Sequence, residues 1–259
     1  MEYQKPRKLY QQGQPITVKG IGLLAIACNS HEFYFNVPIE KCVWGYGWRY
    51  AKGEHPLLNF FDVNQSMDEF YRNYQPSNTL EALTLGLDKR FWHSLELPWH
   101  FDVESKLDVK ERKYGQNQHL GPVSVEKLEY EKYRLKKLIQ SIRENGYNPD
   151  KFGYPNLHIC GYFLLKDNDF LFYIEGGKHR AIALVELGYT SLPVVAIPEP
   201  YFISYDVLAG LAGIAYPKPA LPIVQTIFES YFDIQLREQR KQLVADWMRR
   251  ARGESVVVF

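Results

Sequence analysis

Residues 124–197 follow an order of helical and extended patterns that few folds can satisfy. The segment "SVEKLEYEKYRLKKLIQSIRENG" has apolar residues at helical spacing, with Ser124 as a cap and Gly146 after its end. The runs "LHICGYFLL" and "FLFYI" flank the turn "KDND", which is typical of a β-hairpin. A Gly-Gly turn, a helix from about Lys178 to Leu187 and the strand "LPVVAI" follow. This order of helices and strands predicts an α+β domain.

The residues before this block have extended and then helical patterns. Strands are expected in the runs "ITVKGIGLLAIAC", "EFYFNVPI" and "CVWGYGWRY", because they are rich in β-branched and aromatic residues. Short helices are expected in "SMDEFYRNY", with Ser66 as its cap, and in "NTLEALTLGL", capped by Asn78 or Thr79.

The residues after the block predict further helices. One helix is expected over about residues 219–231, and a charged amphipathic helix over about residues 235–250. The chain is therefore expected to consist of three consecutive parts. These are a β-rich N-terminal region (1–115), the mixed α/β domain (116–200) and a helical C-terminal extension (201–259).

Composition restricts the partners of the chain. The 31 basic and 30 acidic side chains leave a net charge of +1, so no overall field draws the chain to DNA or to anionic lipid. The N-terminus has no apolar core of the kind found in signal peptides, and no apolar run reaches the ~20 residues that span a bilayer. The three cysteines, Cys28, Cys42 and Cys160, are far apart and form no CxxC pair. These features predict a cytoplasmic protein with reduced cysteines and no membrane partner.

The turn "EGGKHR" places three basic side chains at the start of a helix. The first four amides of a helix lack intrahelical partners, and the helix dipole adds a partial positive charge there. Lys178, His179 and Arg180 therefore stand where cations are unfavourable. A bound phosphate would reverse this penalty, and Gly176 and Gly177 would let it approach the backbone. The pattern favours an anion site, while the alternative is that the same side chains only point into water. It is not a P-loop.

Residues 124–197 resemble the ParB/sulfiredoxin superfamily domain. The resemblance rests on the "LIQSIRENGY" helix, the two strands, the "EGGKHRAIALVELGY" turn and helix, and the "LPVVAI" strand, in that order. In that superfamily a Gly-x-His-Arg-type turn contacts nucleotide phosphates. The resemblance therefore implies a ParB/sulfiredoxin-like mixed sheet with helices. It also implies phosphate contacts from Gly176, Gly177, Lys178, His179 and Arg180.

Departures from the family patterns distinguish between its members. Sulfiredoxins carry Gly-Gly-Cys-His-Arg at this turn, whereas Lys178 stands in place of their nucleophilic cysteine, which disfavours sulfiredoxin chemistry. ParB proteins continue into a helix-turn-helix domain, but the residues after 200 contain no clear recognition helix, so DNA binding is disfavoured. Free-serine kinases carry an acidic residue, Gly, a variable residue and then His-Arg. The order of Glu175, His179 and Arg180 is closest to this version.

The resemblance implies a kinase that uses ATP or another nucleotide with Mg²⁺ and acts on a small hydroxyl-bearing molecule, such as an amino acid or a sugar. Such an enzyme needs a phosphate cradle, a cation and a carboxylate that orients the acceptor hydroxyl. Related kinases place a catalytic glutamate just before or on the first turn of the long helix, so Glu126 and Glu129 are the catalytic candidates, together with His179. Glu175 is the candidate for the metal or for pinning His179. Either helix glutamate could instead only offset the helix dipole.

Two other functions fit the same residues. One is a ParB-type regulatory or scaffold protein that binds CTP or ATP without phosphotransfer, and the other is a ParB-like nuclease. In the kinase interpretation, the region over 1–115 is expected to supply the acceptor pocket.

Tryptophans and histidines outside the turn are interpreted as structural. Core packing is favoured over a stacking surface for a sugar at Trp44, Trp48, Trp92 and Trp99. Metal-ligand spacing is lacking at His100, His119 and His158.

Overall fold

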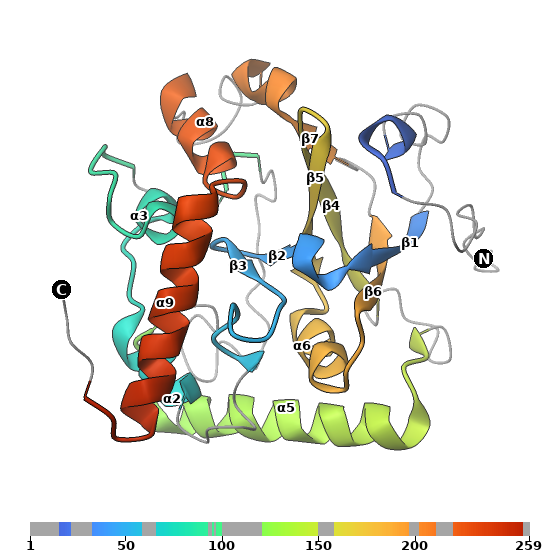
Figure 1. Cartoon of the computed structure of the whole chain (residues 1–259), viewed down its shortest axis with the longest axis vertical. Helices are drawn as coiled ribbons and strands as arrows, with labels where there is room; N and C mark the ends of the chain where they lie inside the picture. Colours follow the sequence, from blue (N-terminus) through green and yellow to red (C-terminus); the bar gives the residue numbers. More distant parts are fainter. Residues whose placement is uncertain are drawn as a thin grey trace. The chain divides into compact units, whose positions relative to one another are not determined.

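The computed structural model describes residues 16–21, 33–58, 66–92, 95, 97–99, 121–149, 158–196, 202–210 and 220–255 (Figure 1). The chain forms two compact units, and each unit combines two separate segments. The first unit contains Met1–Gly45 and Leu138–Tyr205, and the second contains Tyr46–Lys137 and Asp206–Phe259. This division differs from the three consecutive parts expected from the sequence, because strands from the N-terminal region join the mixed domain.

A mixed β-sheet forms the first unit. Its strands are β1 (Phe33–Pro38), β2 (Cys42–Trp44), β4 (Ile159–Lys166), β5 (Asp169–Gly176), β6 (Ser191–Ala196) and β7 (Phe202–Ser204). Their order is β1-β6-β4-β5-β2, and β7 also pairs with β4. The β1–β6 and β4–β5 pairs are antiparallel, whereas β2–β5, β4–β6 and β4–β7 are parallel. The expected α+β class with a mixed sheet is therefore confirmed.

Strands β4 and β5 form the predicted hairpin at the centre of this sheet. Asp167 has φ 53° in the turn, a conformation that aspartate tolerates better than most residues. Most residues of both strands are buried, as expected for strands covered on both faces. Phe163 packs edge-on against Phe35 of β1 and Phe172 of β5, with ring centroids 5.0 Å apart in each pair. Helix α6 (Lys178–Glu186) contacts β4 and β6.

Helices dominate the second unit. They are α2 (Ser66–Asn73), α3 (Thr79–Thr84), α8 (Leu221–Glu229) and α9 (Ile234–Ala251), with the short strand β3 (Trp48–Arg49). Helix α2 packs on α9, near the C-terminal end of α9 in Figure 1, and α3 packs on α8. All four correspond to helices expected from the sequence, which are thus confirmed. The Asn78 side chain caps α3 by accepting a hydrogen bond from the Glu81 amide.

Aromatic side chains form the core of the second unit. The ring of Trp48 lies 5.3 Å from Tyr74, 5.6 Å from Trp247 and 6.3 Å from Phe70. The four tryptophans interpreted as core residues are all buried. Their exposed fractions are 2% for Trp44, 0% for Trp48, 5% for Trp92 and 1% for Trp99.

Helix α5 (Val125–Asn145) spans the division between the units, which falls after Lys137. The Ser124 hydroxyl accepts a hydrogen bond from the Lys127 amide at 3.2 Å, and Gly146 has φ 72°, so the predicted cap and stop are confirmed. The expected apolar stripe is buried at Leu135, Ile139 and Ile142 and half-buried at Leu128 and Leu138.

The same helix also buries an ion pair that the sequence did not reveal. The Lys127 ammonium lies 2.8 Å from the Glu131 carboxylate, and the two side chains are 1% and 2% exposed.

The prediction of a strand from Ile16 to Cys28 is wrong for the residues that the structure describes. Residues 18–21 form a helical turn. The Thr17 hydroxyl accepts a hydrogen bond from the Gly20 amide at 3.1 Å, and the Thr17 carbonyl oxygen accepts one from Ile21. A threonine cap therefore overrides the β-propensity of this run. Residues 22–28 lie outside the described part of the chain.

In the described part of the chain, Ile39–Lys41 and Tyr205–Val207 also form 3₁₀ helices. Within the described ranges, no helix combines the length and the apolar character needed to cross a membrane.

Candidate functional site

The turn between β5 and α6 requires both of its glycines. Gly177 caps the helix with φ 77°, ψ 19°, a left-handed conformation that costs other residues energy. A Cβ atom on Gly177 would lie 2.7 Å from the His158 carbonyl oxygen and 2.8 Å from the Ile159 Cα. A Cβ atom on Gly176 would lie 2.5 Å from the Cys160 sulfur. The chain therefore passes so close to the start of β4 that side chains are excluded at the turn.

An irregular register in the β4–β5 hairpin precedes this turn. Cys160 pairs with Gly176, but the next residue, Gly161, pairs with Ile174. Glu175 is thus the extra residue of a β-bulge, and its side chain is exposed. Bulges of this kind redirect a side chain, and they are frequent beside functional sites. Glu175 consequently lies next to the turn without taking part in the regular ladder.

The first turn of α6 presents basic groups and lacks acidic residues. Lys178, His179 and Arg180 are all half-buried, as are the two glycines. The Gly177 carbonyl oxygen accepts hydrogen bonds from the amides of Arg180 (2.9 Å) and Ala181 (3.0 Å), and no side chain caps the helix. The positive end of the helix dipole is therefore combined with basic side chains at a half-buried position.

Arg180 also ties the helix to the sheet. Its guanidinium donates a hydrogen bond to the His158 carbonyl oxygen at 2.9 Å. His158 itself is half-buried at the start of β4, and its ring packs edge-on against Tyr34 with centroids 5.3 Å apart. This bond fixes the position of one end of the guanidinium. His100 and His119 lie outside the described residues.

The remaining site candidates belong to the other unit. Glu126 and Glu129 are exposed on the part of α5 that belongs to the second unit, whereas Gly176 to Arg180 and Glu175 belong to the first. Hydrogen bonds from its own amide and from the Ser124 hydroxyl hold the pKa of the Glu126 carboxyl below its usual value. Glu129 forms an ion pair with Lys132 at 2.9 Å. The structure thus brings the cradle residues and Glu175 together, and it gives both helix glutamates local partners on α5.

The metal candidate has a limited set of neighbours. In the parts of the chain that the structure describes, no group of three or more His, Cys, Asp or Glu side chains could hold a metal ion. Both described cysteines are unoxidised thiols, Cys42 buried and Cys160 half-buried. Glu175 is an exposed carboxylate that adjoins the turn.

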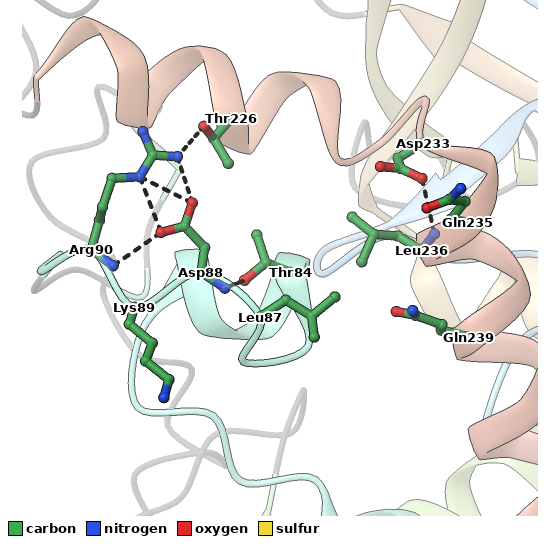
Figure 2. Close-up of a pocket in the computed structure, with 10 residues that line it drawn as sticks. All are labelled: Thr84, Leu87, Asp88, Lys89, Arg90, Thr226, Asp233, Gln235, Leu236 and Gln239. Atoms are coloured by element: carbon green, nitrogen blue, oxygen red, sulfur yellow. Dashed lines mark hydrogen bonds and ion pairs between the residues drawn. The ribbon is translucent and has the colours of Figure 1, made fainter.

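Two hollows of the second unit were not anticipated from the sequence. One has a volume of about 720 Å³ and lies between the segment after α3, the start of α9 and Thr226 of α8 (Figure 2). The other has a volume of about 430 Å³ and shares Asp88, Lys89 and Arg90 with the first. The walls of the larger hollow come from segments far apart in the chain, whereas the smaller hollow is lined by residues between 77 and 92.

Comparisons with known proteins add no assignment. No family model, no curated protein and no solved structure matches the chain.

Proposed function

We propose that the chain is a nucleotide-binding phosphotransferase, a kinase that acts on a small hydroxyl-bearing molecule, with a ParB/sulfiredoxin-like first unit. The observation that carries the proposal is the turn from Gly176 to Arg180. A left-handed glycine, a helix N-terminus without acidic residues and three half-buried basic side chains occur together there. This combination suits the phosphates of ATP or another nucleotide.

Each residue of the turn has a role in this proposal. Gly176 and Gly177 let the turn pack against β4, and the amides at the start of α6 would bind the phosphate oxygens. Lys178 contributes a positive charge, and Arg180 contributes a planar donor that its bond to His158 already orients. His179 donates to a phosphate oxygen or contacts the acceptor hydroxyl.

Glu175 is the proposed metal ligand. Mg²⁺ in kinases is held by one or two carboxylates together with phosphate oxygens and water, so one exposed carboxylate beside the turn suffices. Bound there, the ion would supply neutralisation of the phosphate charge.

The catalytic carboxylate is proposed to be Glu126 or Glu129. Either side chain would hold the acceptor hydroxyl and receive its proton as the phosphoryl group is transferred. Ionised carboxylates suit this role, and the lowered pKa of Glu126 keeps it ionised at neutral pH while making it a weaker base.

Titration calorimetry with ATP and Mg²⁺ tests the binding part. We expect Lys178→Ala to weaken ATP binding about tenfold or more, because a charge-assisted contact is lost. Lys166→Ala is the matched control, since Lys166 is also half-buried and lies at the opposite end of β4. Equal ATP affinity in the Lys178→Ala protein and in the control would refute the assignment of the turn.

Steady-state assays of ADP or AMP release test the transfer part. The kinase proposal predicts release that depends on an added acceptor, and a lower rate with retained ATP binding in Glu126→Gln or Glu129→Gln. The second candidate, nucleotide binding without transfer, is supported by the ion pair that engages Glu129. It predicts nucleotide affinity without acceptor-dependent release in any variant.

A further inference from the structure

In one wall of the larger hollow, the polar side chains form hydrogen bonds with one another and with the backbone. Arg90 donates hydrogen bonds to both carboxylate oxygens of Asp88 and to the Thr226 hydroxyl (Figure 2). The Thr226 hydroxyl in turn donates to the Pro222 carbonyl oxygen at 2.8 Å, and the Thr84 hydroxyl donates to that of Leu80 at 2.7 Å. These groups therefore shape the wall more than they offer hydrogen bonds to a ligand.

The other polar groups of the lining are exposed. They are Lys89, Asp233, Gln235 and Gln239. In Figure 2 the side chains of Gln239 and Leu87 point toward each other from opposite walls, and Lys89 extends away from the ion pair. Two amides and one ammonium thus provide donors and acceptors, while the Asp233 carboxylate already accepts a hydrogen bond from the Leu236 amide at 3.0 Å.

The charge of the lining disfavours an anionic ligand. Lys89 and Arg90 are the cations of both hollows, whereas Asp88 and Asp233 line the larger one and Glu81 and Asp88 the smaller one. The combined lining has two cations against three carboxylates. Phosphate groups and nucleotides would therefore find no excess positive charge.

An exposed aromatic side chain stands at the smaller hollow. Phe91 is 77% exposed, and it follows directly after the three residues that both hollows share. Leu87 and Leu236 add apolar surface to the larger hollow. The ring of Phe91 thus offers an accessible aromatic face beside polar groups, on which an apolar face of a ligand could pack.

We propose that these two hollows bind a neutral saccharide of more than one sugar ring. Each hydroxyl of a sugar both donates and accepts, which matches the amides and the mixed charges, and the C–H faces of the rings match Phe91 and the leucines. The larger hollow alone has the volume of a drug-sized ligand site, and the adjoining one extends it. The inference uses residues of the second unit only, so it does not rest on nucleotide binding by the first.

Saturation-transfer NMR and titration calorimetry of the full chain test the proposal. The probes are maltotriose, cellotriose and mannotriose at millimolar concentration. We expect at least one trisaccharide to bind, and its corresponding monosaccharide to bind more weakly. Gln239→Ala should weaken binding about fivefold, and Phe91→Ala by a similar factor or more.

Matched controls separate binding from folding. Gln242 is an exposed glutamine on the same helix that lines neither hollow, and Tyr133 is an aromatic residue, 59% exposed, on α5. Gln242→Ala and Tyr133→Ala should leave trisaccharide binding unchanged. Because all four side chains are exposed, the variants should fold as the parent does.

Three results would overturn the proposal. They are no binding of any of the three trisaccharides, equal losses in the site variants and the controls, and displacement of the trisaccharide by inorganic phosphate. A test of the same site in an Arg180→Ala protein keeps the two proposals distinct, since saccharide binding should persist there even where ATP binding is lost.

Discussion

Gly177→Ala should destabilise the first unit more than an ordinary glycine substitution does. Two effects add at this position. The left-handed conformation, with φ 77°, costs a residue with a Cβ atom about 1–2 kcal/mol. The Cβ atom would also lie 2.7 and 2.8 Å from backbone atoms of β4, and relieving such overpacking costs about 1–3 kcal/mol. The expected loss of unfolding free energy is therefore about 2–5 kcal/mol.

Gly188→Ala is a matched control at the other end of α6. Gly188 has φ 89°, but no atom lies within 4 Å of the position that its Cβ would occupy. Its substitution should cost only the conformational strain of about 1–2 kcal/mol. The difference between the two variants isolates the close approach of the turn to β4.

Hydrogen exchange followed by mass spectrometry measures this difference within one unit. Peptides from β4 and β5 should exchange roughly tenfold faster in Gly177→Ala than in Gly188→Ala, because ~1.4 kcal/mol changes an opening equilibrium tenfold. Equal exchange rates in the two variants would show that β4 yields at no cost, and the reasoning from backbone contact at the turn would then fail.

Three further predictions concern the second unit. Lys127→Ala should lower its unfolding free energy in urea by about 3–5 kcal/mol because Glu131 is left buried, whereas Lys127→Met with Glu131→Leu should recover most of the loss; an equally unstable double variant would contradict this. Hydrogen bonds from Arg90 hold the pKa of Asp88 below its usual value. The stability that the ionised Asp88 adds to the fold is therefore present above about pH 4 and is lost as the pH falls through the lowered pKa. Carbon-13 NMR should show the Asp88 midpoint rising in Arg90→Ala, and an unchanged midpoint would argue against the pair. Burial raises the pKa of the Tyr74 hydroxyl. The stability that the neutral Tyr74 side chain contributes is therefore fully present below about pH 10 and is lost as the pH rises above it. In urea denaturation, the unfolding free energy should fall less between neutral and alkaline pH in Tyr74→Phe than in the parent.

The turn and its helix could be predicted because the signals are local. Gly-Gly before a helical pattern, Gly188 after it and the alternation of the hairpin all act over a few residues. The structure confirms these elements to within a few residues. The strand expected from Ile16 failed for an equally local reason, since one threonine cap outweighed a run of β-branched residues.

The buried ion pair of α5 could not be predicted from the helical pattern. Lys127 and Glu131 are four residues apart, and exposed ion pairs on helix surfaces have the same spacing. Only the packing of the second unit decides which alternative holds. Tyr71 is affected by the same buried pair, because burial and then the charge of Glu131 raise the pKa of its hydroxyl.

The larger hollow of the second unit shows why a site can leave no trace in a sequence. The hydrogen bond from Arg90 to Thr226 joins residues that are 136 positions apart, and the opposite wall comes from the start of α9. Each lining segment is unremarkable alone: a turn after α3, one position of α8 and the first two turns of α9. A sequence motif can be recognised only where the functional residues lie close together in the chain, as in the Gly-Gly turn. A site assembled from distant segments is determined by tertiary packing, so its ligand has to be inferred from the donors, acceptors and charges that the packing brings together.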